Sequence, residues 1–420
     1  MNILYLVHRI PYPPNKGDKI RSWHILRHLS QRHRVYLGTF IDSAADWQHR
    51  EILAGHCAGC CFVGLSPRLA RLRSLRGLLT GQALTFPYYH SRRLARWVRQ
   101  LLARQRIDAI LVFSSSMAQY VPPAAVADRP AVVDFVDVDS EKWLAYGERH
   151  PGPLRWLYRR EGMRLRRAEQ AIAARFRSSL FVTAEEAALF RRLAPAVADR
   201  VQVLTNGVDT DYFSPQGHYE NPYPPGGPVL VFTGAMDYWA NVDAVTGFVR
   251  DCLPLVRRRQ PDVRFWIVGA RPLPEVQRLA ATPGVQVTGT VPDVRPYLAH
   301  ARLAVAPLQI ARGLQNKVLE AMAMGRAVVA TPAAMEGIPC PAPLDTLVRP
   351  TPAAMAERIL ELLPAGRAEA LGRLARDQVV ARFDWAASLG LLDRLLGGSE
   401  AGGVDAGKAG QRRGAGGRHG

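Results

Sequence analysis

One short segment of the chain combines three side chains whose chemistry suits an anionic ligand. Asn316, Lys317 and Glu320 lie within five residues of each other, where a run with helical periodicity begins. We expect Asn316 to be the N-cap of that helix, which leaves the amides of about residues 317–319 without partners. These amides, the helix dipole and the Lys317 ammonium would together hold a diphosphate, and the Glu320 carboxylate beside them would accept hydroxyl groups such as those of ribose. The plainer alternative is an ordinary strand–turn–helix unit with a solvated lysine and glutamate.

A glycine-containing loop near the start of the chain is a second candidate. Asn15-Lys16-Gly17-Asp18-Lys19 follows the first predicted strand, and Arg21 lies one turn into the next helix. Gly17 permits a close backbone approach to a phosphate or sugar, and Lys16, Lys19 and Arg21 would raise the local potential. The alternative is a solvated turn of mixed charge.

Asp137 is a third candidate, because it directly follows a predicted buried strand at 131–136. A carboxylate there would accept a sugar hydroxyl or a proton. The spacing Asp137-x-Asp139 also resembles a metal-binding pair, although we expect no metal. A structural alternative makes Asp139 or Ser140 the N-cap of the following helix.

The elements that must position these residues alternate along the whole chain. Short apolar runs alternate with amphipathic stretches of helical length, which predicts parallel sheets covered by helices on both faces. Asn221-Pro222-Tyr223-Pro224-Pro225-Gly226-Gly227-Pro228 can continue neither a helix nor a central strand and is therefore a linker. We predict two Rossmann-like α/β domains that face each other across a cleft, where the carboxyl ends of parallel strands collect ligands. The predicted segments are a first domain at 1–205, a hinge at 206–228, a second domain at 229–382, a C-terminal helix at 383–396 that crosses back to the first domain, and a disordered tail at 397–420.

Composition and charge narrow the class of protein. The 420 residues include no apolar run long enough to span a membrane, and the opening strand-like segment does not resemble a secretory signal. Five cysteines form no disulfide framework, which favours a reducing cytoplasm. Residues 1–200 carry 32 Lys and Arg against 16 Asp and Glu, whereas residues 201–399 carry 19 against 18. The first domain is therefore the part expected to meet an anionic surface, and the predicted basic helices at 91–105 and 153–177 are candidates for contact with a membrane. For 91–105, an ordinary sheet-covering helix is the alternative.

Several motifs resemble one known family. LQNKVLEAMAMGRAVVAT, at 314–331, resembles the donor-binding segment of the retaining glycosyltransferases of family 4, which have the two-domain GT-B fold. VLTNGVDTDYFSP, FTGAMD and TGTVPDV resemble the family's hinge strand, the opening of its second domain and the loop along its nucleotide base, and the segment at 8–37 resembles its first glycine loop. KGDKIRSW, VDSEKW and GLQNKVLEAMAMG together resemble a narrower group, the sugar transferases associated with the bacterial PEP-CTERM/exosortase system. The resemblance covers about residues 1–396.

The resemblance implies a donor site and also shows two departures. It implies a catalytic set of Asp137, Lys317 and Glu320, and donor contacts that also come from other residues, namely Gly17, Arg21, Gly234, Val291, Arg312, Gly313, Leu314 and Asn316. Arg312 stands where the family usually has the first of two glutamates eight residues apart, and no Arg and Lys follow the strand at 229–234. Lys317 and Arg312 are then the cations that we expect at the diphosphate.

The function that follows is transfer of a sugar from a nucleotide-sugar to a glycan or lipid-linked acceptor in exopolysaccharide biosynthesis, with retention of configuration. The donor is a substrate; we expect no cofactor, no metal and no nucleic-acid partner. The expected location is cytoplasmic, with the basic first domain peripheral on the inner face of the cell membrane. The alternatives are a nucleotide-sugar epimerase on the same fold and a non-catalytic basic protein that binds nucleotide-sugars or nucleic acid.

Overall fold

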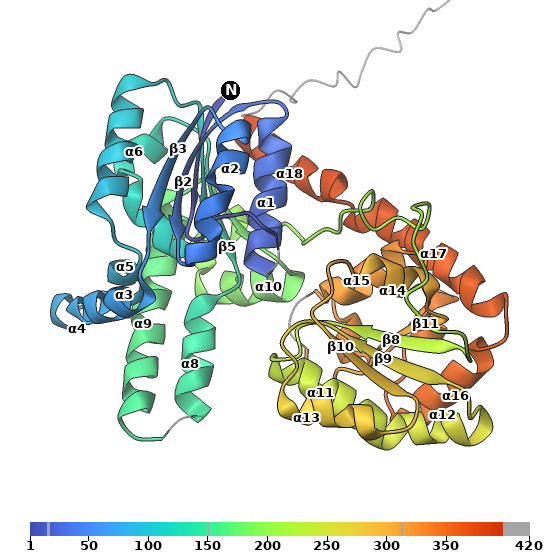
Figure 1. Cartoon of the computed structure of the whole chain (residues 1–420). Coiled ribbons are helices and arrows are strands. Elements are labelled where there is room, and N and C mark those ends of the chain that lie inside the picture. The colour runs from blue at the N-terminus through green and yellow to red at the C-terminus, as the bar shows by residue number, and fades with distance from the viewer. Residues whose placement is uncertain (15–16, 150, 312–313, 398–420) are drawn as a thin grey trace, which may run out of the picture.

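The chain folds into two α/β domains, each built on one parallel sheet (Figure 1). The computed structural model describes residues 1–14, 17–149, 151–311 and 314–397. The predicted tail therefore lies outside the described residues, apart from Gly397. None of the described helices is long and apolar enough to cross a membrane.

The first sheet has seven strands in the order β3-β2-β1-β4-β5-β6-β7, and every pair is parallel. Its central strands are continuous apolar runs that are buried on both faces, as a sheet covered by helices on both sides requires. The strands are β1 (Asn2–Val7), β2 (Arg34–Ile41), β3 (Gly59–Gly64), β4 (Ala109–Phe113), β5 (Ala131–Val136), β6 (Ser178–Phe181) and β7 (Val201–Val203).

The helices of the first domain cover both faces of this sheet and also extend beyond it. α6 (Arg92–Arg104) packs Leu94, Val98 and Leu101 against the core and leaves its arginines outside, as a sheet-covering helix does. The long helix α9 (Pro153–Arg175) pairs with α8 (Asp139–Arg149) in a hairpin that projects below the sheet in Figure 1. The others are α1 (Gly17–Ser30), α2 (Arg50–His56), α3 (Pro67–Ser74), α4 (Arg76–Thr80), α5 (Thr85–Tyr88), α7 (Pro123–Ala127) and α10 (Ala184–Leu193).

The second sheet has five parallel strands in the order β10-β9-β8-β11-β12. They are β8 (Val229–Thr233), β9 (Arg264–Val268), β10 (Val285–Gly289), β11 (Leu303–Ala306) and β12 (Val328–Ala330). The helices around them are α11 (Trp239–Gly247), which continues through a π-helical turn into α12 (Leu253–Arg259), α13 (Pro274–Arg278), α14 (Arg295–His300), α15 (Asn316–Ala323), α16 (Pro352–Leu362) and α17 (Arg367–Phe383).

The chain crosses between the domains twice. The first crossing is the segment after β7, in which Val208 bridges to Asp384. The second is α18 (Trp385–Gly397), whose Trp385, Leu389, Leu392 and Leu396 join the core of the first domain. The His28 imidazole also bonds the Asp393 carboxylate across 2.8 Å. The last helix thus belongs to the first domain by packing, although it follows the second in sequence.

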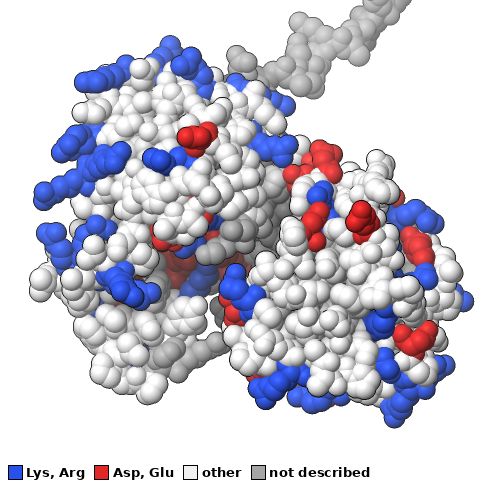
Figure 2. All heavy atoms as spheres, viewed as in Figure 1, with Lys and Arg blue, Asp and Glu red and all other residues white. Residues whose placement is uncertain are grey.

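Residues with a strained backbone conformation lie at the carboxyl ends of the strands. Among the described non-glycine residues, three have positive φ: Ser114 (76°), Val136 (70°) and Arg271 (52°). They follow β4, end β5 and follow β9, respectively. The left-handed region is costly for a β-branched valine, and strain of this kind is typical of functional sites. Figure 2 shows a hollow between the domains in which acidic and basic side chains are visible.

Candidate functional site

The start of α15 differs in one detail from the sequence prediction. The helix begins at Asn316, with Gln315 and not Asn316 at the N-cap, and no side chain caps it. The amides of Val318 and Leu319 both donate to the Gln315 carbonyl, at 2.9 and 3.3 Å. The prediction of Asn316 as N-cap is therefore wrong. Of residues 317–319, only Lys317 has an amide that makes no hydrogen bond to another described residue. The Asn316 Oδ1 atom is itself buried without a hydrogen-bond partner in the described structure.

Lys317 lies in a small polar cluster at the carboxyl edge of the second sheet. Its Nζ donates to the Asn241 Oδ1 at 2.5 Å and lies 5.0 Å from the centroid of the Phe232 ring. Asn241 is held in turn, because its amide nitrogen donates to the Ala235 carbonyl at 2.8 Å. No carboxylate lies within ion-pair distance of Lys317 in the part of the chain that the structure describes. Burial lowers the pKa of Lys317 to about 8, although the charge of Glu320 opposes the shift.

Gly234, directly after β8, has no side chain and so leaves room for Asn241 and Lys317. A Cβ atom at this position would lie 2.8 Å from the Asn241 side-chain nitrogen and 3.5 Å from the Lys317 Cε. Any other residue would therefore push against Asn241. Of the predicted donor residues, Gly234 and Lys317 are brought together although they are far apart in sequence.

Glu320 lies one turn after Lys317 on α15 and keeps part of its surface exposed. Burial raises the pKa of Glu320 to about 7, and the nearby Lys317 charge limits the rise. Tyr212, in the segment between the domains, lies close enough for the Glu320 charge to contribute to its raised pKa, although burial is the larger cause. Lys317 and Glu320 thus form a pair of poorly solvated charges with no direct bond between them in the described structure.

The remaining predicted residues of the second domain are less informative. Val291, beyond β10, and Leu314, just before α15, are partly buried and pack against the core of the domain. Arg312 and Gly313 lie outside the described residues.

Sequence reasoning missed Arg271, which directly follows the turn after β9. Its guanidinium forms a two-point ion pair with Asp237 after β8, at 2.5 and 3.1 Å. Tyr238 and Trp239 beside it are half exposed. The position of Arg271 just past a buried strand is the signal that could have identified it. It is a cation at the same sheet edge as Lys317.

Asp137 lies at the matching edge of the first sheet. Its carboxylate accepts a bond from the Lys142 Nζ at 2.6 Å, and Asp139 accepts from the same atom at 3.2 Å. The two carboxylates thus share a lysine, whose pKa they raise against the opposing effect of burial. Within the described residues no three His, Cys, Asp or Glu side chains are grouped as a metal site would require.

Arg21, which we predicted to contact a ligand, instead has a structural role inside the first domain. Its side chain is fully buried, its Nε donates to Asp134 at 2.7 Å, and its Nη1 donates to the Leu204 carbonyl at 2.7 Å and to the Asn206 side chain at 3.1 Å. Asp134 also accepts from the Val136 amide at 3.1 Å. The ion pair therefore joins α1, the strained end of β5 and the segment between the domains, and the guanidinium is not available to a ligand.

The rest of the predicted glycine loop is only partly described. Lys19 is buried and donates to Asp46 at 2.7 Å, so it does not face a ligand either. Gly17 is exposed at the start of α1, and a Cβ atom added there would meet no heavy atom within 4 Å. Lys16 lies outside the described residues.

A second group that sequence reasoning missed follows β1. The His8 ring stacks on Phe113, its Nε2 lies 3.5 Å from Asp18, and its Nδ1 is buried without a partner in the described structure. Burial would raise the pKa of Asp18, but the bond from His8 and the charge of Arg9 hold that pKa well below its usual range. The group places an imidazole and an anion at the same edge as Asp137.

Comparisons with known proteins show what the two domains are similar to. Residues 227–364 match the family described as "Glycosyl transferases group 1", so the match covers the second domain up to α16. No curated protein sequence matches the chain.

Solved structures match over almost the whole length. Sucrose-phosphate synthase from Thermosynechococcus elongatus has a TM-score of 0.64 at 16% identity, over 94% of this chain and 98% of that one. Anabaena HepE, solved in complex with UDP and glucose, gives 0.62 at 17%, over 93% and 98%. WaaG, a glycosyltransferase involved in lipopolysaccharide biosynthesis, gives 0.60 at 16%, over 94% and 100%. The predicted fold is confirmed: the chain has the two-domain GT-B fold, and its second domain matches the group 1 glycosyl transferases.

Proposed function

We propose that this chain is a glycosyltransferase that moves a sugar from a nucleotide-sugar donor to an acceptor hydroxyl. The observation that carries the proposal is Lys317, a partly buried cation with no carboxylate within ion-pair distance in the described structure, beside Gly234 at the carboxyl edge of the second sheet. A cation that has lost part of its solvation and has no counter-charge is costly unless a ligand supplies one. The match of this domain to the group 1 glycosyl transferases supports a donor diphosphate as that ligand.

The chemistry assigns one role to each side chain. The bond between the anomeric carbon and the diphosphate oxygen breaks, and a new bond forms to the acceptor oxygen. Lys317 would neutralise the charge that develops on the departing diphosphate, which is the largest electrostatic change in the reaction. Glu320 would accept hydroxyl groups of the ribose or sugar. The acceptor proton would pass to a leaving phosphate oxygen or to Asp137 across the cleft.

The finer assignments rest on the sequence motifs and are part of the proposal. They are retention of configuration, membership of family 4, a role in exopolysaccharide assembly with a lipid-linked acceptor, and a cytoplasmic location at the inner face of the membrane. The segment from 314 to 331 supports the first two, and the resemblance to the exosortase-associated transferases supports the others.

The test is transfer from a panel of nucleotide-sugars, measured as release of nucleoside diphosphate with and without a membrane extract as acceptor. Lys317→Ala and Glu320→Ala should each lower turnover by roughly 100-fold or more, in the range found when a group that stabilises transition-state charge is removed. Arg250→Ala is the matched control, because Arg250 is an exposed cation of the same domain. Full activity in both site variants, with circular dichroism unchanged, would refute the assignment. Turnover of the donor without any acceptor, giving an isomeric nucleotide-sugar, would replace transfer by epimerisation.

A further inference from the structure

The first domain contains a long stretch of chain with arginines but no acidic residue. Between Glu51 and Asp108 there are ten arginines and neither Asp nor Glu. All ten arginines lie after β3, in and around the helices α3 to α6. Figure 2 shows basic side chains along the outer edge of the first domain, where these helices lie. An anionic partner would therefore meet no repulsive carboxylate from this stretch.

The helices α3 and α4 turn their leucines outward. Leu69 is 68% exposed, Leu72 67% and Leu79 91%. Their buried positions are instead small residues, Ala70 and Gly77. Large apolar side chains that point away from the core at this density mark a binding surface. We call α3 and α4 the leucine arm.

Defined hydrogen bonds attach the leucine arm to the rest of the domain. Arg73 donates to the carbonyls of Pro87 and Tyr88 at 2.9 and 2.6 Å. From α9, Arg160 donates to the Gly77 carbonyl at 2.7 Å, and the neighbouring Glu161 accepts from the Leu84 amide at 2.6 Å. The exposed leucines are therefore presented on a fixed support.

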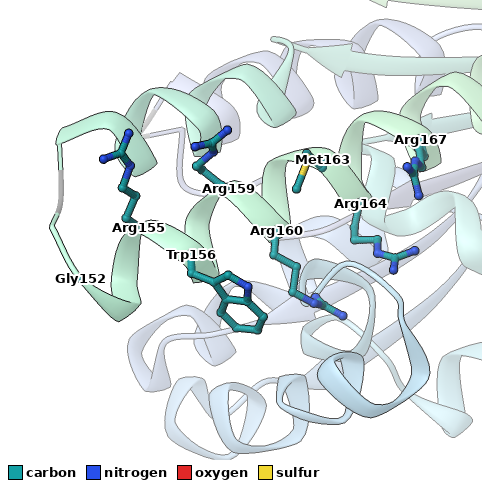
Figure 3. Close-up of a pocket in the computed structure, with 8 residues that line it drawn as sticks. All are labelled: Gly152, Arg155, Trp156, Arg159, Arg160, Met163, Arg164 and Arg167. Carbon is teal, nitrogen blue, oxygen red and sulfur yellow. The ribbon is translucent and has the colours of Figure 1, made fainter.

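The face of α9 next to the leucine arm also carries exposed apolar side chains. Trp156 lies one turn before Arg160 and is 62% exposed, and Met163, just after it, is 50% exposed. Figure 3 shows Trp156 and Arg160 directed toward the leucine arm, with Arg155 and Arg159 elsewhere around the same helix. Eight of the eighteen large hydrophobic side chains that are exposed in the described structure lie within 69–79 and 154–163. The apolar surface of arm and helix is thus concentrated in one region.

From this combination we propose that the leucine arm and the adjoining face of α9 dock onto an anionic phospholipid bilayer. Leucines and tryptophan would enter the interface between headgroups and acyl chains, while arginines without acidic neighbours would pair with lipid phosphates. A nucleic acid would account for the arginines but would leave the leucines in water. Because α9 packs on α8, which starts beside Asp137, docking would hold the cleft near the membrane surface. That last step rests on the proposed function, since only a transferase with a lipid-linked acceptor needs it.

The experiment measures co-sedimentation of the full chain with vesicles of phosphatidylcholine, with and without phosphatidylglycerol. We expect at least tenfold tighter binding to the anionic vesicles, weakening as salt is raised. Leu72→Ser/Leu79→Ser should weaken this binding at least tenfold, whereas Leu374→Ser/Val380→Ser, which alters exposed apolar residues of the second domain, should change it less than twofold.

A second pair of variants tests the charges. Arg68→Gln/Arg71→Gln should weaken binding about 25-fold, because each cation near an anionic surface contributes about fivefold. Arg258→Gln/Arg259→Gln removes the same charge from exposed positions in the second domain and should have little effect.

Three results would overturn the docking surface. They are equal binding to neutral and anionic vesicles, unchanged binding of the leucine variant, and a dimer in sedimentation velocity that the leucine variant disperses, which would make the surface a contact between copies. Failure of the proposed function gives a different pattern. Loss of docking leaves donor turnover without lipid unchanged, whereas Lys317→Ala loses turnover and still binds vesicles.

Discussion

The buried pair of Arg21 and Asp134 gives a prediction whose size follows from its contacts. Both side chains are fully buried, and Arg21 makes two bonds to Asp134, at 2.7 and 3.2 Å, besides those to Leu204 and Asn206. Arg21→Met leaves the carboxyl buried without its partner. Removing one member of such a pair costs about 3–5 kcal/mol.

A double-mutant cycle separates the pair from its surroundings. Asp134→Asn removes the charge but keeps an oxygen that can accept from the Val136 amide. In the double variant no buried charge is left unpaired, so we expect it to recover roughly 1–3 kcal/mol of the loss caused by Arg21→Met. Urea unfolding followed by circular dichroism measures each free energy of unfolding.

The pH dependence gives an independent check. Burial raises the pKa of Asp134 even while Arg21 opposes the rise. Without Arg21 the pKa of the folded state rises further above the unfolded value of about 3.9, so the folded state binds the extra proton and stability falls as pH increases. Arg21→Met should therefore be more stable at pH 5 than at pH 8. A loss below about 1 kcal/mol, or weakened binding of UDP by the folded variant, would refute the structural role of Arg21.

Two further predictions concern the cleft. Glu320→Gln removes a carboxyl whose pKa is raised to about 7, and such a carboxyl destabilises the fold as pH rises from its unfolded pKa toward 7. The variant should therefore be more stable than the native chain by on the order of 1–2 kcal/mol at pH 8 and by almost nothing at pH 4. Identical pH profiles of the two proteins in urea unfolding would contradict this. Asp137→Asn should lower kcat by about 100-fold and leave the affinity for UDP unchanged, because Asp137 contacts Lys142 and no residue of the second domain in the described structure. If Asp137→Asn kept its kcat and Lys142→Met lost about 100-fold, the catalytic role would belong to the lysine.

The fold could be predicted because its signals are local. The central strands of both sheets, such as β1, β4 and β8, are short apolar runs, and the linker is indicated by four prolines between 222 and 228. Lys317 and Glu320 could be singled out for the same reason, since both lie within four consecutive residues of one predicted helix.

Pairings between distant residues could not be predicted. Arg21 looked like a free cation because its partner Asp134 lies 113 residues away, and only the order of β1, β4 and β5 brings them together. The stacking of His8 on Phe113 and the pair of Arg271 with Asp237 also join residues that are far apart in the sequence.

The leucine arm shows a different limit of sequence reasoning. Leucines such as Leu72 and Leu79 normally signal a core, and nothing local shows that α3 and α4 lie beyond the edge of the sheet they follow. The N-cap of α15 was misplaced by one residue, because Gln315 provides the capping backbone although asparagine is the better capping side chain.

The central claim is that Lys317 receives the diphosphate of a nucleotide-sugar. Isothermal titration with UDP on the native chain, Lys317→Ala and the control Arg250→Ala tests it without any knowledge of the acceptor. A desolvated cation that pairs with a phosphate contributes about 2–5 kcal/mol, so Lys317→Ala should bind at least roughly 30-fold more weakly while the control binds as the native chain does. Equal affinity of all three proteins would show that the pocket at α15 does not hold the nucleotide.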